Sequence, residues 1–223
     1  MAIDKKNSPG WYKVVVWIIL ICFVAGFVVS GAMWIFNPAS RNAGMSTTAN
    51  NNNSSQETTT QALIAVINAQ YQPQVETKQT ALKAAPESFD ANKDLGVTYF
   101  QWGQDLMSMG DAQAWAHFQA AVPYLKKAYG LKPADADVAN NYVRALAYSG
   151  DQAVALSTAR EVTQKIPASA DAWFNLGLLL AQSNEANAKK DAIAAFRTAI
   201  EKDTSGTVKA SAQQQIDTLD SVK

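Results

Sequence analysis

The stretch "DAWFNLGLLL", residues 171–180, places Gly177 inside an apolar run that otherwise has the composition of a helix. A glycine in a helix interior costs about 1 kcal/mol relative to alanine. The stretch "DANKDLGVTYF", residues 90–100, repeats the feature, with Gly96 directly after Leu95. A glycine at the same place in two such runs predicts that a second helix passes close by, since the missing side chain permits the approach. We expect the alanines of that second helix to meet the glycine.

The two stretches belong to an internal repeat that is marked by prolines. Pro133 and Pro167 are 34 residues apart, and Pro86 precedes Pro133 by 47 residues. Nine residues after each proline lies a large apolar residue, and small or apolar residues recur at fixed offsets before Pro133 and Pro167. Repetition at a fixed period indicates a stack of similar supersecondary units, here pairs of amphipathic helices.

The repeat resembles the tetratricopeptide repeat, W-x2-L-G-x2-Y followed by A-x3-F-x2-A and a proline. The middle unit has Val143 for the glycine and Ala159 for the aromatic residue, and the first unit has Asn92 for the tryptophan. The third unit matches best, through Trp173, Leu176, Gly177, Ala192, Phe196 and Ala199. The resemblance implies an all-α solenoid of three helical-hairpin repeats, over residues 86–132 (enlarged), 133–166 and 167–204.

Capping residues support these boundaries. Gly110 and Gly150 suit helix C-caps, and Asp111 and Asp151 suit the N-caps that come after them. Further N-caps are expected two residues after each proline, at Ser88, Asp135 and Ser169. First-turn carboxylates favour the helix dipole, which explains the recurring Asp90, Asp137 and Asp171 better than a metal site does.

Helices should close both ends of the repeat array, because a terminal repeat cannot cover its own apolar face. Residues 205–223 predict a C-terminal capping helix, and residues 61–85 predict a lead-in helix or pair of helices that is broken or kinked at Pro73. Pro123 should likewise kink or split the second helix of the enlarged first repeat.

The N-terminal region predicts a membrane anchor. Residues 14–36 carry no charge, and a helix of that length spans about 34 Å, enough for a bilayer core of about 30 Å. Lys5, Lys6 and Lys13 precede the span and only Arg41 closely follows it, so residues 1–13 should be cytoplasmic and the repeats extracytoplasmic. A cleaved signal peptide is the alternative, but its apolar core has only about 7–15 residues.

Two further features concern the anchor and the segment that connects it to the repeats. Gly26 and Ser30 form a small-xxx-small pair of the kind that brings two membrane helices together, which would give a homodimer. Residues 37–60 lack large apolar residues except Met45, and this composition predicts a disordered, flexible linker.

Several functional classes are disfavoured. The chain has one cysteine, Cys22, one histidine, His117, and a formal net charge of +0, which argues against a disulfide framework, a zinc site and nucleic-acid binding. His117 lies beside Trp115 and Phe118. Beside aromatic residues, a lone histidine is more simply interpreted as a half-buried residue of a helix than as a catalytic residue. We therefore expect no enzyme, no catalytic residue, no cofactor and no metal.

A protein-binding surface remains. In the family that the repeats resemble, the first helix of each repeat lines a concave groove. Only Lys93 and Asn141 match the pattern of the subclass that clamps a C-terminal carboxylate, so we reject that specificity. Offsets from the prolines place seven residues in the groove: Lys93, Gln101, Asn140, Arg144, Tyr148, Phe174 and Gln182.

Together these features favour a single-pass membrane protein that presents a protein- or peptide-binding scaffold outside the cytoplasm. It resembles bacterial envelope proteins that assist translocated proteins or the assembly of membrane complexes. Two alternatives stay open: a permanent structural subunit of a membrane complex, and a membrane-anchored receptor whose repeats face the cytosol.

Overall fold

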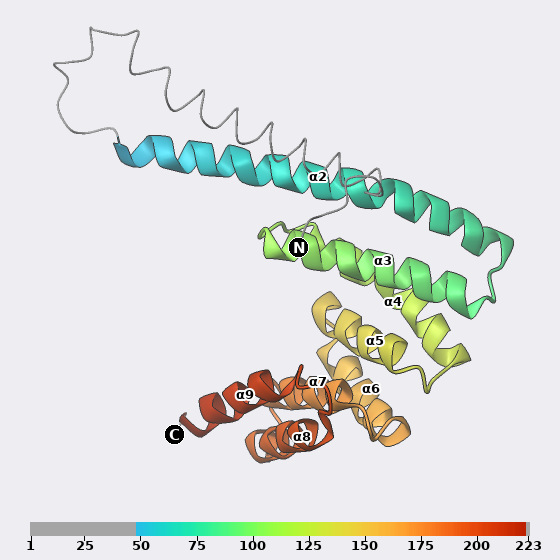
Figure 1. The fold of residues 1–223 in the computed structure, drawn as a ribbon, viewed down its shortest axis with the longest axis vertical. Helices are drawn as coiled ribbons and strands as arrows, with labels where there is room; N and C mark the ends of the chain where they lie inside the picture. The colour runs from blue at the N-terminus through green and yellow to red at the C-terminus, as the bar shows by residue number, and fades with distance from the viewer. Residues whose placement is uncertain (1–47, 222–223) are drawn as a thin grey trace, which may run out of the picture. The chain divides into compact units, whose positions relative to one another are not determined.

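The computed structural model describes residues 48–221, and every regular element among them is an α-helix (Figure 1). The chain divides after Ser54 into two compact units, and the second contains the repeats. The helices are α2 (Thr48–Ala84), α3 (Phe89–Ser108), α4 (Ala114–Leu131), α5 (Ala136–Ser149), α6 (Gln152–Lys165), α7 (Ala170–Ala181), α8 (Ala188–Lys202) and α9 (Lys209–Ser221).

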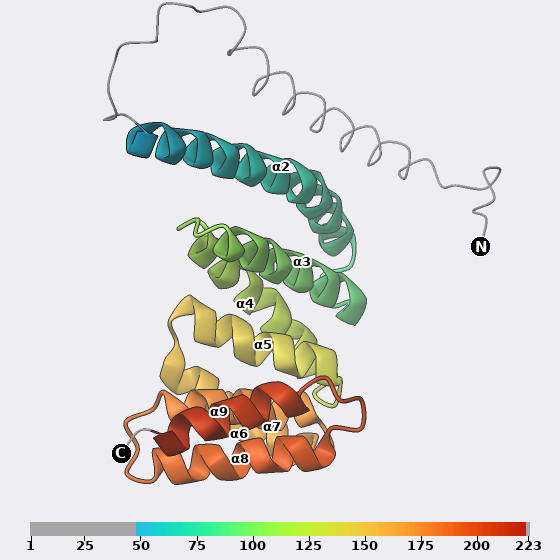
Figure 2. The ribbon, with the colours of Figure 1, turned by 60° about the vertical axis from the view of Figure 1, so that its left-hand side comes forward.

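The repeat units form three stacked hairpins, α3–α4, α5–α6 and α7–α8 (Figures 1 and 2). Each hairpin packs on the next, and α9 covers the far side of α8 through the buried side chains of Val208, Ala212 and Ile216. The all-α repeat fold expected from the sequence is confirmed.

The repeat glycines lie where paired helices touch. A Cβ atom on Gly177 would come within 2.6 Å of the Phe196 ring on α8, and one on Gly96 would come within 2.8 Å of Leu125 on α4. The close approach was predicted, but the expectation that alanines meet the glycines was wrong. Leu125 and Phe196 are fully buried large side chains, and each fills the space that its glycine leaves.

Most of the predicted caps are present. The side chains of Ser88, Asp135 and Ser169 accept hydrogen bonds from backbone N–H groups three residues on, at 3.3, 3.0 and 3.2 Å. Gly150 ends α5 with φ of 99°. Asp111 is not the N-cap of α4: its carboxylate accepts a hydrogen bond from the N–H of Gln113, and α4 begins only at Ala114, because a turn separates the helices.

Asn92 takes the place of the repeat's tryptophan without loss of the local contact. In the third repeat, Trp173 donates its indole N–H to the Pro167 carbonyl at 2.9 Å. In the first repeat, the buried Asn92 amide donates to the Pro86 carbonyl at 3.0 Å. Both side chains therefore tie the first turn of a helix to the proline that precedes it.

The helices α2 and α4 are continuous through their prolines, so the break expected at Pro73 and the split expected at Pro123 were wrong. The alternative, a kink at either proline, stays a prediction. Both prolines lie on the exposed side of their helix. The carbonyls that lose their hydrogen bond, at Ala69 and Gln119, belong to exposed residues and can bond to water instead. The helix α2 curves along its length rather than breaking (Figure 2).

The helix α2 begins at Thr48, inside the segment expected to be a disordered linker, residues 37–60. No proline or glycine lies between Thr48 and Gln72, so nothing stops the helix from extending toward the N-terminus. Within residues 48–221, no helix combines the length and the apolar character that crossing a membrane requires. The predicted span at 14–36, with Gly26 and Ser30, lies outside the described residues.

Candidate peptide-binding groove

The first helices of the second and third repeats form a groove between them. Asn140, Arg144 and Tyr148 follow one another at intervals of four residues along one side of α5. They border a hollow of about 410 Å³. Its lining residues are Asp137, Asn140, Asn141, Arg144 and Tyr148 of α5, and Asp171, Phe174, Asn175 and Leu178 of α7.

A second hollow of about 120 Å³ continues the groove toward the ends of the two helices. It shares Arg144, Tyr148, Asn175 and Leu178 with the first hollow and adds Gln182. Because both hollows follow α5 and α7 from their first turns to their last, the groove runs along the helices rather than across them.

Hydrogen bonds hold the two walls of the groove in register. The Asn175 amide donates to Asn140 Oδ1 at 3.3 Å, and Asn140 Nδ2 donates to the Ser169 hydroxyl at 3.3 Å. Ser169 is also the N-cap of α7. The repeat-to-repeat contact and the helix cap therefore form one chain of bonds, which fixes the N-terminal part of the groove.

Aromatic rings of the first repeat support the middle of the groove. The Arg144 guanidinium lies 4.9 Å from the centroid of Phe100, on α3, and the Tyr148 ring stacks on Phe118, on α4, at 4.8 Å. Phe100 and Phe118 are buried. Such cation–π and stacking contacts favour the observed orientation of both groove side chains.

Charge is unevenly distributed along the groove. Asp137 and Asp171 lie in the first turns of α5 and α7, and both are exposed. The Lys93 amine lies 3.3 Å from Asp135 and 4.0 Å from Asp137. Burial tends to raise the pKa of Asp135, but the bonds from the Val138 N–H and from Lys93 outweigh it and hold that pKa below its usual value.

Five of the seven residues predicted for the groove line its two hollows: Asn140, Arg144, Tyr148, Phe174 and Gln182. Lys93 and Gln101 of α3 border neither hollow. Lys93 is instead bonded to Asp135 across the repeat boundary, and Gln101 is exposed. Asp137 and Asn141 also line the larger hollow. Neither was among the residues predicted for the groove, although both lie on the helical stripe of Arg144 and Tyr148.

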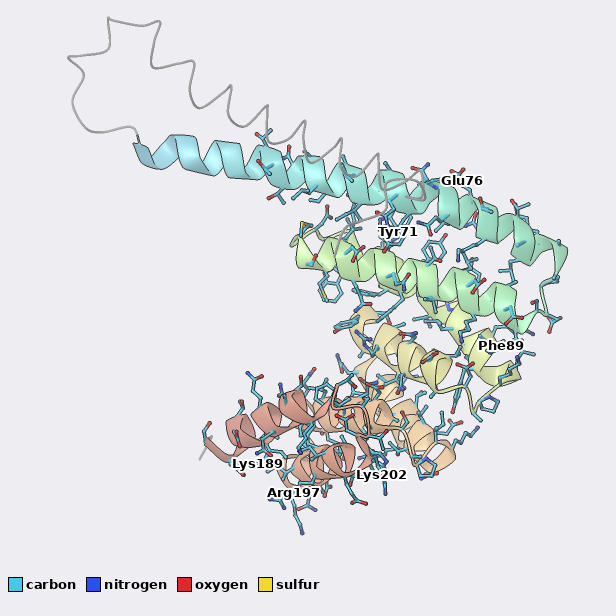
Figure 3. The ribbon with its side chains drawn as sticks, in the orientation of Figure 1. Tyr71, Glu76, Phe89, Lys189, Arg197 and Lys202 are labelled. Carbon is cyan, nitrogen blue, oxygen red and sulfur yellow. The ribbon has the colours of Figure 1, made fainter. Side chains whose placement is uncertain are left out.

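His117 lies outside the groove, in an aromatic cluster between the first repeat and α2. Its ring stacks on Trp102 at 3.8 Å. Trp102 donates to Asn68 of α2 at 2.8 Å and stacks on Tyr71 at 5.8 Å. Tyr71 lies on the side of α2 that faces α3 (Figure 3). Burial lowers the pKa of His117, and the nearby Asp111 carboxylate offsets part of that shift. The half-buried position expected for His117 is confirmed.

Comparisons with known proteins identify the fold. No protein-family model matches the sequence, and no curated protein sequence matches it. A solved structure of TTC0263, described as a thermophilic TPR protein in Thermus thermophilus, has 14% identity and a TM-score of 0.51, over 72% of this chain and 80% of its own. A crystal structure of MamA has 20% identity and a TM-score of 0.50, over 68% and 78%.

A double mutant of MamA, described as RS-1 ArsTM, is similar to the same extent, with 20% identity and a TM-score of 0.50. At these levels of identity the likeness concerns the arrangement of the backbone. The chain therefore has the tetratricopeptide-repeat fold, in agreement with the resemblance found in its sequence.

Proposed function

We propose that this chain is a membrane-anchored scaffold whose α5–α7 groove binds a peptide segment of another protein. The observation that carries the proposal is the hollow of about 410 Å³, where a cation, amides and aromatic side chains held by their neighbours surround an open space. Arginine and tyrosine are enriched among the interface residues that contribute most to the free energy of binding between proteins. The fold supports a protein-binding scaffold, since repeat stacks present extended surfaces of this kind.

A photo-crosslinking experiment tests the groove. A benzophenone amino acid is placed at Gln182, which borders the groove, or at Val154, which is exposed on α6, the second helix of its repeat. We expect irradiation of native membranes to join the Gln182 variant, and not the Val154 variant, to a discrete partner. Equal crosslinking from both positions would place the binding surface elsewhere.

We further propose that residues 14–36 anchor the chain and that the repeats lie outside the cytoplasm. The three lysines before the span and the single arginine soon after it support this orientation. In a Cys22→Ser background, single cysteines replace Ser8 or Ser55. A membrane-impermeant thiol reagent on intact cells should label only the Ser55 variant. Labelling of the Ser8 variant alone would instead support a receptor that faces the cytosol.

The scaffold role and the structural-subunit alternative predict different behaviour on solubilisation. A scaffold that exchanges its partners should release them in detergent as the salt concentration rises, because the groove has charged side chains. A permanent subunit should keep one partner at constant stoichiometry. Size-exclusion chromatography of the solubilised complex at low and high salt separates the two.

A further inference from the structure

We propose that the groove selects an extended peptide segment with a basic and an acidic residue three positions apart. The basic residue would pair with Asp137 and Asp171, and the acidic residue with Arg144. This inference rests on the proposed function, since it assigns a ligand class to the same groove.

The acidic residue of the peptide is assigned by the state of Arg144. Among residues 48–221, no carboxylate lies within the 4.0 Å of an ion pair with this guanidinium. The guanidinium carbon lies 4.9 Å from the centroid of the buried Phe100 ring, a contact that limits the orientation of the guanidinium before any ligand arrives. An oriented guanidinium directs its N–H groups in a fixed fork, which matches a carboxylate with two parallel hydrogen bonds.

The basic residue of the peptide is assigned by the carboxylates at the other end of the groove. The Asp137 side chain is 85% exposed, and Lys93 approaches it only at 4.0 Å while lying closer to Asp135. Asp171 is at the equivalent position of the next repeat, and its side chain is also exposed. Two carboxylates that border one hollow attract a lysine or arginine side chain and repel a carboxylate.

The helix geometry sets the spacing. Asp137 and Arg144 are seven residues apart on α5, which is about 10 Å along the helix axis. An extended peptide advances about 3.3 Å per residue, so three residues cover the same distance. The hollow also runs along α5 and α7, so a peptide that lies along it brings its basic side chain to the two aspartates and its acidic side chain to Arg144.

The uncharged lining residues of the hollow suit the rest of such a segment. Phe174 and Leu178 give the far wall apolar surface, and Tyr148 adds a fixed ring beyond Arg144. Small or apolar residues at the two intervening positions of the peptide would lie against this wall. Charge therefore determines the register of the peptide, and apolar contact adds affinity.

Peptide selection tests the inference. The full chain in detergent is immobilised and a random twelve-residue peptide library on phage is selected against it, with Arg197→Gln as the matched control. Arg197 extends outward from α8 and borders a different hollow, so this control removes the same single positive charge as Arg144→Gln, outside the groove (Figure 3). We expect the enriched peptides to contain Lys or Arg three positions from Asp or Glu.

Synthetic versions of the enriched peptides then identify the pairing groups. The Arg144→Gln change should weaken binding about tenfold or more, and should have little effect on a peptide whose acidic residue is already Gln. The double change Asp137→Asn with Asp171→Asn should also weaken binding about tenfold or more, and should have little effect on a peptide whose basic residue is already Gln. Thermal unfolding of each variant shows whether it is folded.

The outcomes separate the inference from the proposed function. Enriched peptides that lose binding on Phe174→Ala but contain no charge pair at this spacing would overturn the inference and leave the groove as the binding site. If no enriched peptide responds to any of the groove changes, both the inference and the proposed function are wrong.

Discussion

Gly177 of α7 lies against the ring of Phe196 on α8: a Cβ atom added to Gly177 would come within 2.6 to 2.9 Å of three atoms of the ring. The ring is fully buried and cannot move aside without disturbing the core. Even the smallest side chain is therefore too large at this position, and the helix-propensity cost of glycine is offset by the contact that it permits.

The first prediction concerns this contact. The change Gly177→Ala should lower the free energy of unfolding by about 1–3 kcal/mol, the usual cost of overpacking a core. Gly130→Ala is the matched control, because a Cβ atom on Gly130 of α4 would meet nothing within 4 Å. It should stabilise the chain by up to about 1 kcal/mol through helix propensity. Urea denaturation measures the free energy of unfolding of both variants. Equal changes in Gly177→Ala and Gly130→Ala would contradict the contact between Gly177 and Phe196.

The second prediction concerns pH. Because burial lowers the pKa of His117, the unfolded chain binds its proton more tightly than the folded chain does. Stability should therefore fall as the pH drops below the ordinary histidine value of 6.5, and the loss should level off below the lowered native pKa. The His117→Gln variant should lose less stability than the natural chain between pH 7.5 and pH 5.5.

Between pH 7.5 and pH 5.5 the carboxylates do not interfere with this measurement. The pKa values of Asp135 and Glu161 are lowered in the folded chain, so these groups lose their contribution to stability only at more acidic pH. Identical pH profiles for the natural chain and His117→Gln would show that His117 is not desolvated against Trp102.

The third prediction concerns the start of α9. The Asp203 carboxylate accepts hydrogen bonds from the backbone N–H groups of Gly206, Val208 and Lys209, each at 2.8 Å. Local desolvation raises its pKa, but these bonds outweigh that effect and lower the pKa to about 2. Asp203→Ala should lower the melting temperature by loosening α9, whereas Asp220→Ala at the exposed end of α9 should not.

The stabilisation from Asp203 should be complete above its ordinary pKa of 3.8 and should disappear as the pH falls toward 2. A difference in melting temperature between the natural chain and Asp203→Ala that stays constant from pH 5 to pH 2 would contradict this assignment.

The fourth prediction concerns the contact between α2 and α3. The Tyr71 hydroxyl donates to the Asp105 carboxylate at 2.8 Å, and burial together with that carboxylate raises the pKa of Tyr71 to about 12. Tyr71→Phe should cost about 1–2 kcal/mol, because it removes a hydrogen bond to a charged group. Tyr124→Phe is the control, since its hydroxyl makes no hydrogen bond within the described part of the chain; its cost should be near zero.

The sequence was sufficient to predict the repeat fold, because prolines, glycines and caps act over short distances. The glycine and proline offsets located all three hairpins, and Ser88, Asp135 and Ser169 marked where their first helices begin. The effects of Pro73 and Pro123 could not be predicted in the same way. They depend on whether each proline faces solvent, which is set by the rotation of the whole helix against its neighbours.

The groove was predictable only in part. The intervals of four between Asn140, Arg144 and Tyr148 predicted their shared stripe on α5. The Phe100 ring beneath Arg144 comes from another repeat, so its position depends on how α3 packs beside α5. The offset that placed Lys93 in the groove could not show that its amine would bond to Asp135, on the following repeat.

The contact of α2 with the first repeat has a consequence for the order in which the chain unfolds. Long side chains make this contact, through the hydrogen bonds Tyr71–Asp105, Asn68–Trp102 and Gln79–Tyr99. A glycine seated against a buried side chain, as in α3–α4 and α7–α8, fixes helices more firmly. Hydrogen exchange should therefore reach the amides of α2 by a local opening that leaves α3–α9 folded, so that the array of helices frays from its N-terminal end first.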